Sequence, residues 1–192
     1  MFCYNATEKE VLKIRNEIFL QDVIPILKEK GFEKSPFKTT CFGRHDSLVY
    51  IYEMYRLRDD RFLDLITVNI HRKDKYIKIF INSFELFPQI ASISQLSEVD
   101  GLKYHIPPNS KKKMRIDVDF IKGPPILSKS FWFDQLELGS YFTKKGYCKQ
   151  VEKLRKSVKS KVKNIDLFFQ KWSKLHFPNI VKYDGELLNE KD

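Results

Sequence analysis

The chain has 192 residues, of which 42% are hydrophobic and 31% charged, and its formal net charge is +10. This is a globular composition and excludes an intrinsically disordered chain. The first residues, MFCYNATEKE, lack the pattern of a signal peptide, and no apolar run approaches the ~18 residues of a membrane span. The cysteines Cys3, Cys41 and Cys148 are odd in number and far apart, which argues against a disulfide framework. We therefore expect one cytoplasmic domain without a membrane partner.

A helix is expected first, over residues 8–30. Thr7 and Glu10 form the pattern of a capping box, and apolar residues then recur at helical spacing. Pro25 should kink or restart this helix, with Asp22 as the new cap. Gly31 should end it in a left-handed conformation.

Strands are expected next, because β-branched and aromatic residues are dense in six segments, numbered 38–43, 47–57, 62–71, 76–82, 114–122 and 130–139. Alternation in the third segment places Ile66, Val68 and Ile70 on one face, and the fourth segment repeats this pattern. The sequence therefore predicts an antiparallel meander with one buried side.

A long amphipathic helix is expected near the C-terminus. Apolar residues recur there every three or four positions, at Val151, Leu154, Val158, Val162, Ile165, Phe169 and Trp172. About 28 helical residues measure ~42 Å, so the helix runs along the whole body or breaks near Asn164. Residues from about 183 to 192 are expected to form a loose tail. The predicted fold class is α+β, an antiparallel sheet meander packed by an N-terminal helix and this late helix, in a single domain of residues 1–192.

The positive charge is concentrated in this late helix. Residues 143–163 contain nine basic side chains and one acid, Glu152, a local balance of +8 that leaves +2 for the other 171 residues. Candidate contacts to nucleic acid are the lysines beside the apolar positions, namely Lys145, Lys149, Lys153, Lys156, Lys159 and Lys163. An amphipathic helix also needs a polar face, which is the simpler interpretation of the same lysines.

Most catalytic patterns are absent from the sequence. There is no G-x-G turn, no H-E-x-x-H motif and no paired-cysteine zinc spacing, so we expect no cofactor and no metal. Asp117 and Asp119 alternate on a predicted strand, and two such carboxylates are able to bind one cation. Alternation alone also accounts for them, so a metal-dependent nuclease or hydrolase is the weakest of the functional hypotheses.

The stretch ILKEKGFEK at residues 26–34, followed by strands and a late helix ending in FFQKW, resembles an uncharacterised family of small bacterial cytoplasmic proteins. That family opens with a helix, a GF-x-K turn and an antiparallel sheet, so the resemblance implies the same order of elements. Some members are thought to lie near toxin or mobile-element genes, which implies an immunity-like or antitoxin-like role. We therefore expect a non-enzymatic bacterial protein that binds another macromolecule, first a protein and alternatively a nucleic acid.

Overall fold

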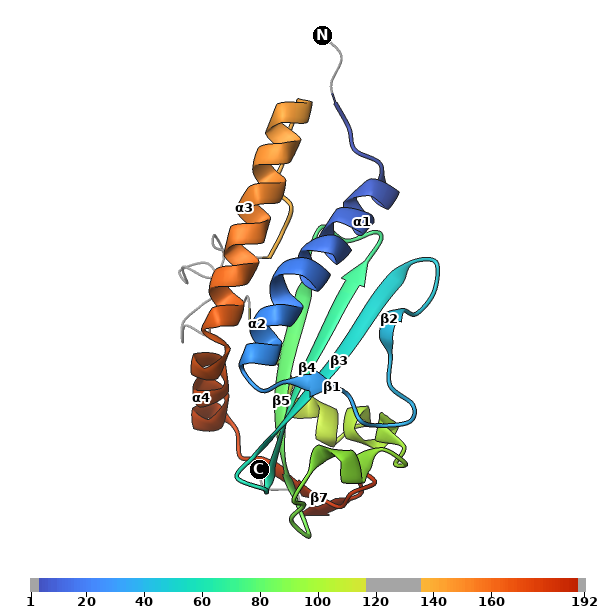
Figure 1. Cartoon of the computed structure of the whole chain (residues 1–192), viewed down its shortest axis with the longest axis vertical. Coiled ribbons are helices and arrows are strands. Elements are labelled where there is room, and N and C mark those ends of the chain that lie inside the picture. The colour runs from blue at the N-terminus through green and yellow to red at the C-terminus, as the bar shows by residue number, and fades with distance from the viewer. Residues whose placement is uncertain (1–3, 117–135, 190–192) are drawn as a thin grey trace.

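The computed structural model describes residues 4–116 and 136–189, which form an α+β fold (Figure 1). Its helical elements are α1 (Glu8–Ile18), the π-helical turn η1 (Phe19–Val23), α2 (Ile24–Glu29), the 3-10 turns η2 (Ile93–Leu96), η3 (Gly101–His105) and η4 (Asn109–Lys112), α3 (Lys144–Lys163) and α4 (Ile165–Leu175). Its strands are β1 (Glu33–Lys34), β2 (Phe42–Arg44), β3 (Val49–Arg58), β4 (Phe62–His71), β5 (Lys78–Leu86), β6 (Met114–Arg115), β7 (Asn179–Val181) and β8 (Leu187–Asn189). No helix in the described part of the chain has the length and hydropathy that crossing a bilayer requires.

Strands β3, β4 and β5 form the antiparallel meander that the sequence predicts. The order across the sheet is β1-β3-β4-β5-β7-β8, with β2 also pairing with β3 and β6 with β5. Strand β7 runs parallel to β5, with Glu85 opposite Ile180, so the sheet is mixed and not purely antiparallel. The reason is that α4 connects back to the β5 edge of the meander. The strand that follows α4 is β7, and it runs along β5 in the same direction.

The C-terminal segment carries strand β8, which pairs antiparallel with β7. Gly185 has φ of +81°, a conformation open to glycine, and its amide donates to the Lys182 carbonyl at 2.9 Å to close the turn. This corrects the expected loose tail for residues 183–189. Strands of three residues are too short to show a period in the sequence.

Other predicted strands differ from the structure at their ends. Residues 38–41 form a turn and irregular backbone, and only β2 remains of the first predicted strand. Strand β5 continues to Leu86, beyond the predicted end at residue 82. Of the strand predicted at 114–122, residues 114–115 form β6, and residues from 117 onward lie outside the described part. Residues 136–139 contain an isolated bridge from Glu137 to Tyr76.

The N-terminal helix begins as predicted. The Thr7 hydroxyl accepts from the Glu10 amide at 3.2 Å, and the Glu10 carboxylate accepts from the Thr7 amide at 2.7 Å, which completes the capping box. At its end, Gly31 has φ of +80°, and the Phe32 amide donates to the Leu27 carbonyl at 2.9 Å. This is the Schellman arrangement that a glycine after a helix indicates.

Pro25 changes the middle of this helix without ending it. The turn before it is π-helical, and the Ile24 amide donates to the Phe19 carbonyl five residues earlier. The wider turn accommodates a proline, which has no amide hydrogen and crowds the preceding turn. The expected cap at Asp22 is wrong, because Asp22 lies inside the π-helical turn and its carboxylate faces α3.

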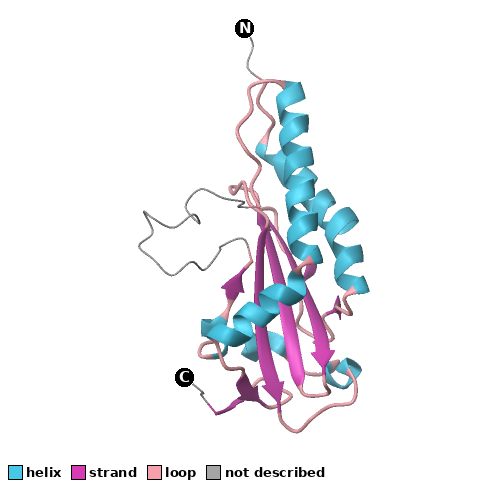
Figure 2. Ribbon diagram, turned by 90° about the vertical axis from the view of Figure 1, so that its left-hand side faces the viewer, coloured by secondary structure: helices cyan, strands magenta, loops and turns pink. Residues whose placement is uncertain are grey.

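The late helix breaks at Asn164, the second of the two predicted alternatives. Asn164 has φ of −97° and ψ of 21°, and it separates α3 from α4. The predicted apolar positions are all buried in one core with the N-terminal helix and the sheet. Figures 1 and 2 show, from two directions, that α3 extends past the end of the sheet.

The sheet packs on both faces, which corrects the expectation of one buried side. The helices cover the face that carries Ile66, Val68 and Ile70, as predicted. On the opposite face a second core joins Leu65 and Phe84 to residues that follow β5. Its members are Phe37, Tyr55, Leu63, Leu65, Phe84, Leu86, Ile90, Leu96, Tyr104 and Val181. Burial of each such side chain stabilises the fold by about 1.5–3 kcal/mol.

Candidate functional site

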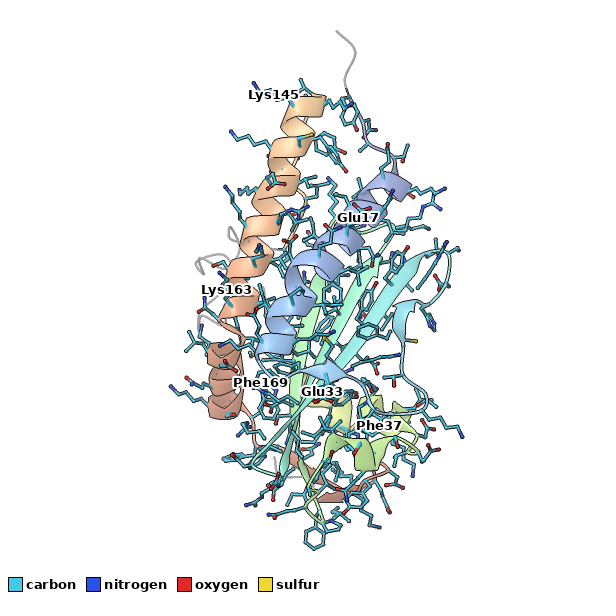
Figure 3. All side chains as sticks on the ribbon, in the orientation of Figure 1. Glu17, Glu33, Phe37, Lys145, Lys163 and Phe169 are labelled. Atoms are coloured by element: carbon cyan, nitrogen blue, oxygen red, sulfur yellow. The ribbon has the colours of Figure 1, made fainter. Side chains whose placement is uncertain are left out.

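Five of the six candidate lysines lie on the outer face of α3, opposite its buried apolar side. We call Lys145, Lys149, Lys153, Lys156 and Lys163 the lysine stripe; all five are exposed. Figure 3 labels Lys145 and Lys163 near the two ends of α3. Eighteen residues separate them, so the stripe measures ~27 Å.

Lys159, the sixth candidate, lies on the flank of α3 that faces the N-terminal helix. Its Nζ is 3.3 Å from Asp22 Oδ1, and Arg155 Nη1 is 2.6 Å from Asp22 Oδ2. The Asp22 side chain is only 10% exposed. Lys159 and Arg155 therefore hold α3 against the π-helical turn, and Lys159 separates from the stripe.

The lysine stripe has no acidic partner among the described residues. Glu152, the one acid of α3, is on the Arg155 side, with Oε1 3.4 Å from Arg155 Nε. No described carboxylate makes an ion pair with any stripe lysine. Five positive charges are thus left facing solvent along one line, and such a line attracts anionic macromolecules.

The projecting end of α3 is fixed by a cluster of three tyrosines. The ring centroids of Tyr141 and Tyr147 are 5.0 Å apart, and Tyr4 is 5.7 Å from Tyr147. The Tyr4 amide also donates to the Phe142 carbonyl at 3.0 Å. Burial raises the pKa of Tyr147 to about 12, so its ring stays neutral in this cluster. The part of the stripe beyond the sheet is therefore held on a packed helix.

A shallow hollow of about 260 Å³ lies at the other end of the stripe, where α3 meets α4. It is lined by Ser160, Lys161, Asn164, Leu167, Phe168 and Lys171. Leu167 is 53% exposed, which is high for a leucine at a helix junction. The hollow offers apolar contact next to positive charge.

A second charged cluster joins β3 and β4 to α2 and α4. Asp64 is fully buried and accepts from Arg56 at 2.9 Å and from Arg58 at 3.3 Å. Arg56 Nη1 also donates to Asp166 at 2.8 Å, and its guanidinium lies 4.4 Å from the centroid of the Phe32 ring. Burial lowers the pKa of Arg56, but the bonds to Asp166 and Asp64 outweigh it and raise the pKa.

Beside this cluster is a larger open hollow of about 740 Å³, lined on one side by α4. The Arg56 guanidinium makes four hydrogen bonds, to Asp64, Asp166 and the Lys30 carbonyl. Because four of its five N–H donors bond inside the protein, this cluster is best explained as a connection between the sheet and α4.

The carboxylates considered for metal binding, Asp117 and Asp119, lie outside the described residues. Within residues 4–116 and 136–189, no three His, Cys, Asp or Glu side chains converge in a way that could hold a metal ion. No protein-family model matches the chain, and no curated protein and no solved structure is significantly similar to it. The resemblance of residues 26–34 to a bacterial family therefore stays an expectation.

The sequence reasoning missed Asp22 as the residue that separates Lys159 and Arg155 from the stripe. Asp22 is 133 residues from Arg155 along the chain, so no local pattern shows the contact. The one available signal was an acid on the N-terminal helix next to Pro25, and this suggested a cap instead.

Proposed function

We propose that this chain is a non-enzymatic binding protein that holds nucleic acid through the lysine stripe of α3. The observation that carries the proposal is the line of five exposed lysines without acidic partners among the described residues. In this proposal the protein acts in the cytoplasm, and phosphate groups supply the negative charge.

The chemistry of the stripe favours contacts with the phosphate backbone over reading of bases. Lysine is a point charge, whereas bidentate contacts to guanine use arginine. The stripe has no aromatic side chain for stacking on unpaired bases. At ~27 Å it is somewhat shorter than one turn of B-DNA, which measures about 34–36 Å. We therefore expect binding that depends on salt and little on sequence.

The test is a titration of duplex DNA at several salt concentrations. With about five phosphate contacts, log K falls against log salt with a slope of about −4 to −5. Replacing Lys149, Lys153 and Lys156 with Gln should flatten this slope by about three units. Folding stability should barely change, since exposed charges contribute little to it.

A matched control removes the same charge elsewhere. Lys9, Lys28 and Lys38 are exposed and lie outside α3, so their triple Gln variant has the same net charge as the stripe variant. The control should keep the parental slope. Equal slopes of log K against log salt for the two triple variants would contradict the proposal. So would loss of DNA binding by the parent before the salt concentration is raised to the physiological value.

A second candidate is a protein partner, in the immunity-like or antitoxin-like role that the sequence suggests. The hollow beside Leu167 and Phe168 favours it, because a partner's apolar side chain fits next to positive charge. In this case Leu167→Asp should abolish a complex isolated from the native cell, while DNA binding stays at the parental level. A complex that survives Leu167→Asp would remove this candidate.

A further inference from the structure

Three ionisable side chains meet on the sheet face opposite the helices. Glu53 comes from β3, His105 ends η3, and Lys113 follows η4. Lys113 Nζ is 3.0 Å from His105 Nδ1, and His105 Nε2 is 3.3 Å from Glu53 Oε1. The side chains of His105 and Glu53 are 19% and 14% exposed. The three groups thus form a continuous chain in a largely buried setting.

We assign the proton positions from these contacts. The Lys113 ammonium has hydrogens to donate, so His105 Nδ1 accepts and a neutral imidazole carries its proton on Nε2. That nitrogen faces the Glu53 carboxylate, close enough for electrostatic attraction although the contact does not have hydrogen-bond geometry. At 3.0 Å, Nδ1 is close enough to take a proton from the Lys113 ammonium.

Burial lowers the pKa of Lys113, and the nearby Glu53 opposes this effect without reversing it. The amine is therefore easier to deprotonate than an exposed lysine, and a neutral amine is the nucleophilic form.

Thr67 is a further polar residue on this face of the sheet, next to Glu53. It lies directly opposite Glu53 in the β3–β4 register, on the same face of the sheet. Thr67 is 7% exposed, and its Oγ1 has no hydrogen-bond partner. A buried hydroxyl without a partner costs about 1–3 kcal/mol, so a bound group that accepts from it would recover that cost.

We propose that Lys113, His105 and Glu53 form a reactive-amine site that captures small aldehydes as Schiff bases. Thr67 donates its hydroxyl hydrogen to the carbonyl oxygen of the aldehyde. This site is separate from the lysine stripe and does not depend on nucleic-acid binding.

The reaction balances without an oxidant or a reductant. The Lys113 ammonium gives one proton to His105 Nδ1, and the free amine adds to the carbonyl carbon. The new C–N bond replaces the π bond of the carbonyl, and the oxygen takes the proton back from His105 to give a carbinolamine. The nitrogen of this carbinolamine is still protonated; one of its protons moves to the hydroxyl, which leaves as water, and the product is the protonated imine. Glu53 holds the transient imidazolium and is not consumed.

The experiment incubates the full chain with glyoxylate and cyanoborohydride at neutral pH. The borohydride reduces the imine to a stable secondary amine, and peptide mass spectrometry then measures labelling at each lysine. Lys149 is exposed and has no ion-pair partner among the described residues, so it serves as the internal reference for ordinary reactivity. Lys113 should be labelled faster than Lys149, by roughly tenfold for each unit by which its pKa falls.

Variants test whether fast labelling of Lys113 depends on its neighbours or only on the accessibility of the lysine. His105→Gln should slow labelling of Lys113, because it removes the base that takes the proton from the ammonium. Thr67→Val should slow labelling while the resistance to urea stays equal or rises, because it removes a buried hydroxyl that has no partner. Labelling of Lys113 no faster than Lys149 in the parent chain overturns the proposal whatever the variants do. Unchanged labelling in folded His105→Gln protein also overturns it.

Discussion

The Asp22 carboxylate lies 2.6 Å from the Arg155 guanidinium and joins the π-helical turn of the N-terminal helix to the middle of α3. This contact has two effects. It holds α3 against the N-terminal helix, and Asp22 offsets the positive charge of Arg155 and Lys159 beside the lysine stripe. The π-helical turn places Asp22 there, because its extra residue per turn rotates the side chains that precede Pro25.

Asp22→Ala should therefore destabilise the fold by about 1–3 kcal/mol, since it removes the nearer of the two acidic partners of Arg155, whose side chain is 25% exposed. The same change should strengthen DNA binding, because Arg155 and Lys159 join the stripe. Urea denaturation and the salt titration measure the two effects. Glu17→Ala is the control on the same helix, because the ion pair of Glu17 with Lys13, at 3.7 Å, is exposed. It should cost less than about 0.5 kcal/mol.

Val158→Asp should unfold the protein. Val158 is fully buried on α3, and a carboxylate there would have no partner in an apolar core. Circular dichroism over a temperature ramp measures the loss of helix. Lys156→Asp, two residues earlier on the exposed face, should melt like the parent. A Val158→Asp protein with parental melting would contradict the packing of α3.

Asp166 should make the protein more stable at neutral pH than in acid. Burial raises the pKa of Asp166, but hydrogen bonds from Lys30 and Arg56 outweigh this and lower it below the ordinary 3.8. The folded state therefore favours the ionised carboxylate, and this contribution is present above pH 3.8 and is lost as the pH falls through the lowered pKa.

Asp166→Asn should accordingly reduce stability at pH 7, with a difference from the parent that shrinks as the pH falls below 3.8. Urea midpoints measured across the acid range give this comparison. A difference that stays constant with pH would mean that the charge of Asp166 contributes nothing.

Arg15→Lys should be far from conservative. The Arg15 side chain is fully buried and donates to three carbonyls, those of Val11, Tyr76 and His71, at 2.8–3.0 Å. Burial lowers its pKa to about 10, with a small opposing effect of Asp74. A lysine ammonium cannot reproduce the planar arrangement of guanidinium donors that reaches these three carbonyls. Each carbonyl left unpaired should cost about 1–3 kcal/mol of unfolding free energy.

Arg72→Lys is the matched control, because its ion pair with Glu8 at 3.2 Å is exposed. It should change the unfolding free energy by less than about 0.5 kcal/mol. Equal losses of unfolding free energy in the two variants would show that the hydrogen bonds of the buried Arg15 guanidinium are not what joins α1 to the β4–β5 hairpin.

The sequence by itself determined the features that depend on neighbours within a few residues. The capping box at Thr7, the left-handed Gly31 and the apolar side of α3 follow from local hydrogen bonding, backbone sterics and the 3.6-residue period. The same holds for the β3–β4–β5 meander, because short turns join strands whose alternation already marks a buried face.

Only the tertiary structure decided which residues distant in the chain meet. The parallel pairing of β7 with β5, the second core and the contact of Asp22 with Arg155 all join segments that no periodic pattern relates. The same is true of Lys113, His105 and Glu53, which three separate elements bring together. Such contacts arise when whole elements pack, so the exposed charges of α3 were readable in the sequence, but the partners that neutralise some of them were not.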